Sequence, residues 1–309
     1  MLDFTLGFSR MPAIYFTSLT PGAGNTAVAL GVASLARAAG RKVGYAKLAP
    51  TTPRDLDVDF ASTQGIASTA PFASGFDLVA IDGPLASAAA SEAATVLVVH
   101  YQPGLDIAAI AAACDPFKGK FLGIVLNAVP ELALPAVKTE IVPALTQAGL
   151  TVLGLLPEDR QLLARTVHEY NRRLAGKILN SAENADALVE NILVGAMVTD
   201  SSEFYYSRRE NKALITRGDR PDLQWNALEG STRCLILTAG IDPIPYVLDK
   251  AQAAGIPVLV VPADTRATLE HIAAFPSPAF HHPAKVERIA QLLRTHAALA
   301  ALGLQAALA

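Results

Sequence analysis

Short apolar runs alternate with longer Ala- and Leu-rich stretches from Ala13 onward. Apolar runs bounded by turn residues predict buried strands, and the stretches between them predict helices. Their alternation predicts an α/β fold of right-handed βαβ units on a parallel sheet. The expected strands are 13–18, 42–47, 77–82, 95–99, 121–127 and 152–156, and a helix-like stretch over 161–170 closes the series.

A second alternating series follows, with turns marked by Gly240 and Gly255. Its expected strands are 177–179, 191–196, 212–216, 233–238 and 257–262, and its expected helices are 185–190, 222–228, 245–254 and 265–274. We therefore place a domain boundary near Ala175. The predicted organisation is an extension over 1–12, a first domain over 13–175, a smaller α/β domain over 176–280 and a C-terminal helix over 281–309.

The tail from Pro283 to Ala309 follows one long helical pattern, and it carries almost no charge after Arg294. Its residues are strong helix formers. An exposed apolar face of that length is unusual in a monomer, so we expect this face to be covered. The tail either packs on the second domain or forms an oligomer contact.

Composition narrows the class of protein. Hydrophobic residues make up 51% of the chain and charged residues 17%, which is typical of an α/β protein with buried parallel strands. A net charge of −3 excludes the basic field that nucleic acid or anionic lipid requires. There is no run of 18 apolar residues and no signal-like opening, so we expect a cytoplasmic location. Cys114 and Cys234 are expected to be buried thiols.

The segment from Ser18 to Thr26, Ser-Leu-Thr-Pro-Gly-Ala-Gly-Asn-Thr, lies between the first expected strand and a helical stretch. A strand, a glycine-rich turn and a helix N-terminus together present backbone N–H groups to an anion. In the phosphate-loop pattern G-x-x-x-x-G-K-[ST], however, Leu19 replaces the first glycine and Asn25 replaces the lysine. The candidate contacts for an anion or nucleotide are Gly22, Gly24, Asn25 and Thr26.

The missing lysine changes the expected chemistry. An ammonium–phosphate contact at ~4 Å involves on the order of 4 kcal/mol at an effective dielectric near 20. We therefore expect this loop to keep its shape, and with it some affinity for an anion, without efficient phosphoryl transfer. A tight turn that binds nothing is the alternative.

Carboxylates near this loop are candidate metal ligands. Thr26 is the position that holds Mg²⁺ in a working site, and Asp82, which ends an expected strand, is its partner. Asp55, Asp57 and Asp59 alternate along the chain, so an extended segment would carry all three on one face, as a hard cation requires. The predicted metal ligands are Thr26, Asp59 and Asp82. Two alternatives are open: Asp82 caps the turn that follows its strand, and the three alternating residues form a solvated loop face.

Four stretches of the second series resemble a known family when they are taken together. They are 191–197, 211–222, 227–229 and 235–240, which read NILVGAM, NKALITRGDRPD, ALE and LILTAG. This succession closely resembles the DRTGG domain found in the N-terminal half of long phosphate acetyltransferases. The first domain resembles the dethiobiotin-synthetase-like P-loop module that precedes DRTGG there. The resemblance extends from about Ala13 to Ala274.

The resemblance implies a regulatory or ligand-sensing unit. In the long enzymes the transferase domain follows DRTGG, and this chain ends before one could begin, so we do not expect acetyl transfer. The implied cofactor is ATP or ADP with Mg²⁺. The implied partners are a nucleotide or small anion and an enzyme of central metabolism. The apolar tail adds the expectation of further copies of this chain in a homo-oligomer.

Further site residues follow from the resemblance. Lys47 resembles the family's strand-terminal lysine, which faces the phosphates and would supply charge that Asn25 lacks; an exposed lysine is the alternative. Asn127 is similar to the asparagine that contacts the base, and its amide can both donate to and accept from a purine. Hydrogen bonding at the end of its strand is the alternative. The region between Lys47 and Asp77 is shorter than the substrate region of catalytic relatives.

In the second domain, Gly218-Asp219-Arg220 follows an expected strand and precedes an expected helix. Open α/β sheets bind ligands at that end of their strands, so Asp219 and Arg220 are candidate contacts. Asp219 as a helix cap with Pro221 at the first helical position is the alternative. His281 and His282 have no further metal ligands at suitable spacing in the sequence, which argues against zinc.

Two other classes of function remain open. One is an enzyme, such as an ATP-dependent carboxylate–amine ligase that uses Thr26 and Lys47. The other is a purely structural docking or oligomerisation protein. The absence of lysine at residue 25 favours a protein that is not an enzyme.

Overall fold

The computed structural model describes residues 13–48, 56–117, 119–196 and 202–304. The chain divides into two compact units, Met1–Asp159 with Phe280–Ala309, and Arg160–Ala279. The first unit is therefore built from two separate segments of the sequence. The predicted boundary near Ala175 lies inside the second unit, and the C-terminal segment belongs to the first.

A parallel sheet forms the centre of the first unit. Within the described residues it has seven strands in the order β3-β2-β4-β1-β5-β6-β7. They are β1 (Ala13–Ser18), β2 (Val43–Lys47), β3 (Ala67–Ser68), β4 (Leu78–Asp82), β5 (Ala94–His100), β6 (Phe121–Val129) and β7 (Val152–Pro157). The six strands expected from the hydrophobic pattern are confirmed, while the two-residue β3 was not predicted.

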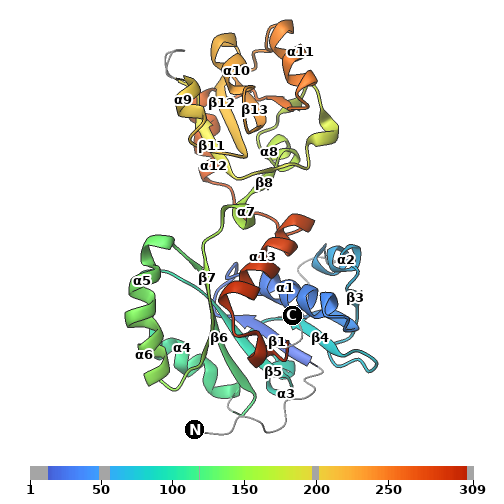
Figure 1. The fold of residues 1–309 in the computed structure, drawn as a ribbon, viewed down its shortest axis with the longest axis vertical. Helices are drawn as coiled ribbons and strands as arrows, with labels where there is room; N and C mark the ends of the chain where they lie inside the picture. Colours follow the sequence, from blue (N-terminus) through green and yellow to red (C-terminus); the bar gives the residue numbers. More distant parts are fainter. Residues whose placement is uncertain (1–12, 49–55, 118, 197–201, 305–309) are drawn as a thin grey trace. The chain divides into compact units, whose positions relative to one another are not determined.

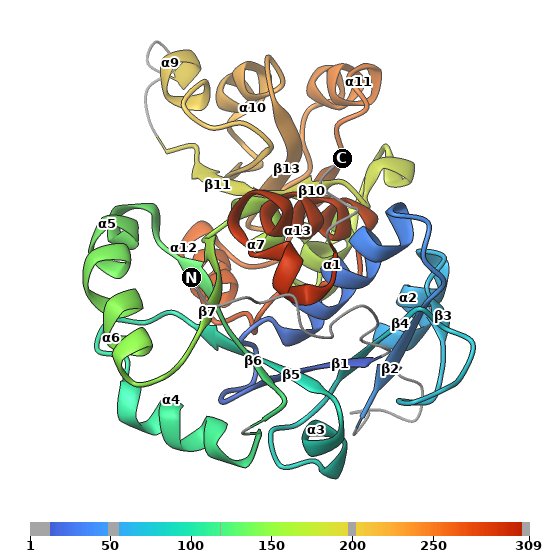
Figure 2. The same cartoon turned by 60° about the horizontal axis from the view of Figure 1, so that its bottom comes forward.

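Helices cover both faces of this sheet. α1 and α13 pack on one face, and α3 and α4 pack on the other (Figures 1 and 2). The helices are α1 (Asn25–Ala38), α2 (Leu56–Thr63), α3 (Ala88–Glu92), α4 (Ile107–Cys114), α5 (Leu134–Ala136), α6 (Val142–Gln147) and α13 (Pro283–His296), with a π-helical turn over Val137–Ile141. Because both faces are covered, the central strands are apolar along their whole length rather than alternating.

The contact between α1 and α13 depends on a glycine. A Cβ atom added at Gly31 of α1 would lie 2.7 Å from Leu293 and 3.0 Å from Ile289, both on α13. Glycine therefore lets the two helices approach closely. The prediction that the tail packs on the second domain is wrong, because α13 belongs to the first unit.

The tail is also not one continuous helix. After His296 the backbone leaves the helix to pair with β7, where the Ala298 N–H donates to the Leu153 carbonyl at 2.6 Å. A short 3₁₀ turn over Leu299–Leu302 follows. Leu299, Leu302 and Leu304 are buried, so the described part of the tail does not present the exposed apolar face that was expected.

The second unit has a five-stranded sheet among its described residues, in the order β11-β12-β13-β14-β9. β9 is antiparallel to its neighbour, and the other pairs are parallel. Helices α10 and α11 pack on one face, α8 and α12 on the other. The elements are α7 (Arg160–Leu163), β8 (Arg165–Thr166), α8 (Val167–Arg173), β9 (Lys177–Ile178), β10 (Leu188–Val189), β11 (Asn191–Val194), α9 (Ser202–Tyr206), β12 (Lys212–Arg217), α10 (Pro221–Ala227), β13 (Thr232–Thr238), α11 (Pro245–Ala253), β14 (Val258–Val260) and α12 (Thr265–Ala273).

Two helix predictions in this unit need correction. The stretch 185–190 contains β10, which pairs antiparallel with β8. The stretch 161–170 is interrupted by β8, after which Thr166 caps α8 by accepting from the Glu169 N–H at 3.2 Å. The Thr-x-x-Glu spacing is a helix-start signal that the periodicity alone did not reveal.

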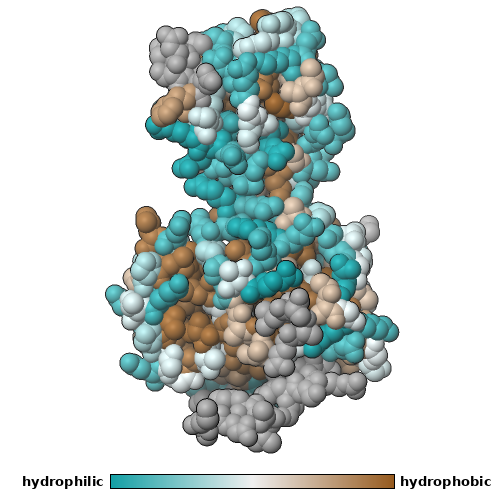
Figure 3. Space-filling view, viewed as in Figure 1, coloured by the Kyte–Doolittle hydropathy of each residue, from teal (hydrophilic) through white to brown (hydrophobic). Residues whose placement is uncertain are grey.

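The surface of the first unit carries apolar side chains over α5 and α6 (Figure 3). Leu132, in the turn that precedes α5, is 97% exposed. None of the described helices is both long enough and apolar enough to cross a membrane.

Candidate functional site

The Gly22–Thr26 turn joins β1 to α1 at the carboxyl edge of the first sheet. Gly22 and Gly24 have φ angles of 78° and 98°, in the left-handed region that favours glycine. Gly24 is also the N-cap of α1, and it offers no side-chain cap. The amides of Gly24, Asn25 and Thr26 make no hydrogen bond with the described part of the chain. These N–H groups and the positive end of the helix dipole are what the turn offers to an anion.

Asn25 points back into the protein. Its Nδ2 donates to Asp82 Oδ1, and its Oδ1 accepts from Ser18 Oγ at 3.3 Å. The side chain therefore ties the turn to the ends of β1 and β4. It carries no charge, and its amide is engaged with protein groups on both sides.

Asp82 is the centre of the polar network. It ends β4, is fully buried, and accepts at Oδ2 from Thr26 Oγ1 at 2.6 Å, Tyr45 OH at 3.0 Å and Lys47 Nζ at 2.5 Å. Asn25 supplies a fourth donor, to Oδ1. Each carboxylate oxygen has about two lone-pair sites, so three donors crowd Oδ2 while Oδ1 accepts from one.

Lys47 ends β2 and lies between two carboxylates. Its Nζ is 2.5 Å from Asp82 Oδ2, 2.9 Å from Asp57 Oδ2 and 3.0 Å from Thr26 Oγ1. An ammonium has three N–H donors, and these three acceptors match them. Lys47 thus lies beside the Gly22–Thr26 turn, and its hydrogen-bonding capacity is used within the protein.

The same contacts shift the pKa values of Lys47 and Asp57. Burial opposes the charged form of Lys47, but the neighbouring Asp82 and Asp57 outweigh it, so the pKa of Lys47 is raised. Burial likewise opposes the charged form of Asp57, and hydrogen bonds from His281 and Lys47 outweigh it, so the pKa of Asp57 is lowered. Both shifts favour the charged forms of Lys47 and Asp57.

Asp57 also connects the site to the segment that re-enters the first unit. His281 Nε2 lies 2.7 Å from Asp57 Oδ1, and the His281 ring meets Phe60 of α2 edge-on at 5.5 Å. Phe280, the first residue of the returning segment, meets Phe60 at 6.5 Å. His281 therefore acts as a partner of a carboxylate in this structure.

The predicted extended segment with three carboxylates on one face is wrong, because Leu56–Thr63 is the helix α2. In a helix, residues two apart point about 200° apart, so Asp57 and Asp59 do not share a face. Asp55 lies outside the described residues. No cluster of three or more His, Cys, Asp or Glu side chains suited to a metal occurs among the residues that the structure describes.

Asn127, near the end of β6, supports the turn from the other side. Its Nδ2 donates to the Ala23 carbonyl at 2.9 Å. A Cβ atom at Gly24 would lie 2.3 Å from this nitrogen, so the amide packs directly against the glycine. In this structure the amide makes the strand-end hydrogen bond that was the alternative to a base contact.

In the second unit, Asp219 and Arg220 lie at the carboxyl end of β12. Asp219 is paired with Arg217 through two contacts of 3.0 and 2.9 Å, and Arg220 with Asp222 through contacts of 3.0 and 2.7 Å. The N-cap of α10 is Arg220, without a side-chain cap, so the alternative role of Asp219 as a cap is wrong. Ion pairs this exposed contribute little to stability, because solvent screens them.

The same sheet edge contains two buried polar groups that the sequence did not indicate. Gln224 Nε2 donates to the carbonyls of Arg217 and Gly218 at 2.9 and 3.0 Å, while its Oε1 is buried without a hydrogen-bond partner among the described residues. The Tyr206 hydroxyl is also buried without a hydrogen-bond partner among the described residues, and burial raises its pKa to about 12. Both groups come from helices, whose buried faces are not visible in a loop motif.

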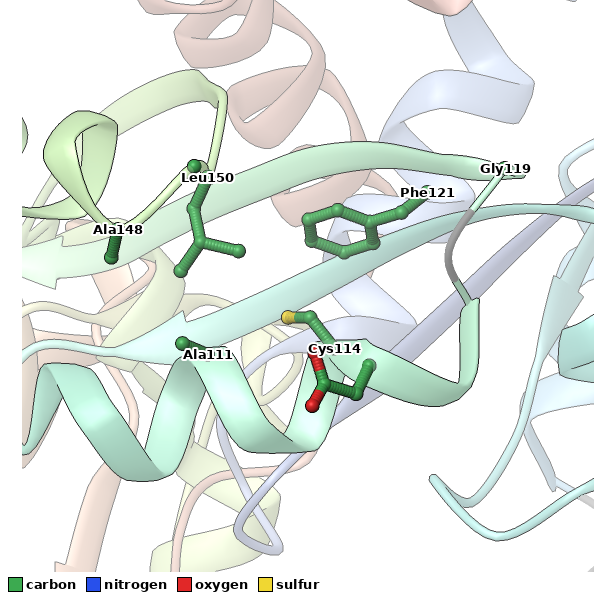
Figure 4. Close-up of a pocket in the computed structure, with 8 residues that line it drawn as sticks. Ala111, Cys114, Gly119, Phe121, Ala148 and Leu150 are labelled. Carbon is green, nitrogen blue, oxygen red and sulfur yellow. The ribbon is translucent and has the colours of Figure 1, made fainter.

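A pocket in the first unit lies away from this network. Its volume is about 330 Å³, and it opens between the end of α4 and the amino ends of β6 and β7 (Figure 4). The parallel strands place it at the sheet edge opposite the Gly22–Thr26 turn. Cys114 lines it, but burial raises the pKa of that thiol to about 11, which makes it a poor nucleophile.

Tyr45 and the pairing of His281 with Asp57 were not predicted from the sequence. Tyr45 could have been found, because it lies two residues before Lys47 on the same strand and so faces the same side. The His281 contact joins residues 224 positions apart, and no local pattern signals it.

The fold and its polar network define a two-unit α/β protein with a glycine turn at the carboxyl edge of the first sheet. Residues 169–275 match the model of the DRTGG domain, so the chain carries a DRTGG domain in its second unit.

Similarity to phosphate acetyltransferase is weak. The chain is 30% identical over 138 residues to a phosphate acetyltransferase of Synechocystis sp., a match that covers 41% of this chain and 19% of that enzyme. The chain thus matches about a fifth of its relative's length.

A crystal structure of the CBS and DRTGG domains of the regulatory region of Clostridium perfringens pyrophosphatase, complexed with diadenosine tetraphosphate, is also similar. It is 17% identical, with a TM-score of 0.33, over 48% of this chain and 72% of that one. A likeness at this TM-score is too slight to support a fold or ligand assignment.

Proposed function

We propose that this chain is a non-catalytic or weakly catalytic regulatory protein. Its first unit acts as a P-loop module without the lysine, and it senses ATP, ADP or a small metabolic anion at the Gly22–Thr26 turn. The DRTGG domain relays whether the anion is bound, either to the rest of this protein or to a partner enzyme. The observation that carries the proposal is Asn25, whose neutral amide is tied to Asp82 where a catalytic loop presents an ammonium.

The geometry argues against efficient phosphoryl transfer. Lys47 is the nearest replacement for the missing charge, but its three donors already serve Asp57, Asp82 and Thr26. An absent ammonium–phosphate contact of on the order of 4 kcal/mol corresponds to about a thousandfold in rate. A turn of this kind holds an anion better than it promotes transfer.

Anion binding is supported by the turn itself. Gly22 and Gly24 adopt left-handed conformations, and the amides at the start of α1 are not used by described residues. The regulatory role is supported by the DRTGG domain and by the weak similarity to phosphate acetyltransferase. In this proposal the acetyl-transfer chemistry itself belongs to the relative.

The test is isothermal titration calorimetry with ATP, ADP, NADH and acetyl phosphate. We expect binding tighter than about 1 mM for at least one of these anions, which corresponds to about −4 kcal/mol. Gly24→Ala should weaken it, because the added Cβ disturbs the turn. Gly104→Ala is the matched control, because Gly104 also has a positive φ of 78° but no atom within 4 Å of an added Cβ.

Two outcomes would overturn the proposal. Failure of all four anions to bind would remove the sensing role. Rapid ATP hydrolysis that disappears in Thr26→Ala and Lys47→Ala would instead favour the ATP-dependent ligase.

A further inference from the structure

Resemblance to nucleotide-dependent P-loop enzymes implies a Mg²⁺ ion held near Thr26 and Asp82. Whether the residues of this chain suit such an ion can be tested on their contacts. The Thr26 hydroxyl donates a hydrogen bond to Asp82 Oδ2 at 2.6 Å. That carboxylate oxygen also accepts from Tyr45 and Lys47, and its other oxygen accepts from Asn25. The two groups expected to serve the metal are therefore engaged with each other and with protein donors.

A cation already lies among the oxygens that a metal would use. Lys47 Nζ is within 3.0 Å of one oxygen each from Asp57, Asp82 and Thr26. Mg²⁺ requires oxygen ligands at about 2.0–2.1 Å in a near-octahedral arrangement. An Mg²⁺ ion bound to these oxygens would lie close to the Lys47 ammonium, and the two positive charges would repel each other. The residues present do not suit Mg²⁺.

We propose that the Lys47 ammonium takes the place of the divalent cation, so that the anion at the Gly22–Thr26 turn is bound without Mg²⁺. Three acceptors hold the ammonium: the carboxylate of Asp82 on β4, the carboxylate of Asp57 on α2 and the hydroxyl of Thr26 on α1. The part of this inference that concerns the anion rests on the proposed function. The part that concerns the cation position does not.

The arrangement also limits the ligand. Lys47 neutralises one of the two carboxylates beside the turn, and His281 partners the other. With its three donors used, the ammonium has none to offer a phosphate, so recognition falls to the backbone amides of the turn. The ligand is therefore an anion that arrives free of a coordinated metal, such as inorganic phosphate or metal-free nucleotide.

The cation position is tested without any anion. Mn²⁺, a probe for Mg²⁺ sites, is titrated into the full chain and followed by electron paramagnetic resonance. Wild-type protein should not bind it at this position. Lys47→Ala vacates three oxygen ligands and should bind Mn²⁺ at least about tenfold more tightly, an effect that Thr26→Ala in the same background should reduce. Lys177→Ala, at an exposed lysine of the second unit, is the control and should match wild type.

The result that would overturn the inference is Mn²⁺ binding to wild-type protein that Asp82→Asn removes. A folded Lys47→Ala variant that gains no Mn²⁺ would overturn it as well. Should that variant fail to fold, Lys47→Gln, which keeps much of the side chain's length, takes its place. The wild-type titration decides the question independently of either variant.

The anion part is tested by titrating ATP in EDTA and in excess MgCl₂. The inference expects ATP to bind at least as tightly in EDTA as in excess MgCl₂, because Mg²⁺ removes the metal-free form of the nucleotide. Binding that requires Mg²⁺ would overturn the inference and leave the proposed sensing role intact. If ATP, phosphate and the other anions all fail to bind in both buffers, the proposed function is refuted. The Mn²⁺ titration would still decide the cation position.

Discussion

Replacing Lys47 by methionine removes an ammonium and keeps a side chain of similar length. The ammonium pairs with Asp82, and the side chains of the pair are 15% and 0% exposed. Removing one partner of a buried pair costs about 3–5 kcal/mol, because the other charge stays buried without compensation. Asp82 keeps three hydrogen-bond donors, Asn25, Thr26 and Tyr45, so we expect the lower end, about 3 kcal/mol.

The assay is urea denaturation followed by far-ultraviolet circular dichroism at pH 7. A loss of about 3 kcal/mol would be a large part of the 5–15 kcal/mol typical of a domain. Lys177→Met is the control, because that lysine is exposed, and its effect should stay within about 0.5 kcal/mol. The double variant Lys47→Met, Asp82→Asn has no uncompensated charge at this pair, so the two changes should couple favourably.

Two results would refute this reasoning. One is a loss below about 1 kcal/mol for Lys47→Met, a value typical of an exposed ion pair. The other is strict additivity of the two changes, since groups in direct contact are expected to show an interaction free energy of about 0.5–3 kcal/mol. Either result would mean that the carboxylate of Asp82 does not depend on this ammonium.

Gly24→Ala should destabilise the first unit by more than the 1–2 kcal/mol or so that a left-handed alanine costs, because its Cβ also meets Asn127 Nδ2 at 2.3 Å. Gly104→Ala gives the conformational cost alone, and equal losses in urea titrations would contradict the proposed contact. Asp57 has a pKa lowered below its ordinary 3.8, so it contributes stability above that pH, which is lost as the pH falls through the folded-state value. Asp57→Asn should therefore be less stable than wild type at pH 7, and the difference in melting temperature should shrink below about pH 4; a constant difference would argue against a stabilising role for the ionised Asp57 carboxylate.

The resemblance to DRTGG was recognisable from the sequence because its motifs are local. Strand 212–217 and the helix from Pro221 follow one another within a dozen residues, and the glycine between them is part of the same turn. A Cβ at Gly218 would lie 1.9 Å from the Ile241 carbonyl oxygen, so only glycine suits that position. The strand, glycine and helix start are visible in the sequence, whereas the close approach of Ile241 is visible only in the fold.

Predictions failed where a local pattern was ambiguous. Alternation from Leu56 to Phe60 suggested an extended segment, yet the same residues place Asp57 and Asp59 in the first turn of a helix, where the dipole favours acidic side chains. The stretch 185–190 has good helix formers, but backbone pairing of β10 with β8 decided its conformation. In the second case a contact distant in sequence outweighed local propensity.

The sequence by itself determined the strands of the two larger sheets apart from β3, the glycine turn at the end of β1, and the absence of an ammonium at residue 25. These follow from hydrophobic runs and from residue identity, which need no knowledge of distant neighbours. The tertiary structure alone decided that Lys47 lies between Asp57 and Asp82, and that α13 returns to pack on α1. The reason is physical: the ends of parallel strands meet at one sheet edge only after the chain has crossed over several times, so the partners of a charge there are set by topology rather than by spacing.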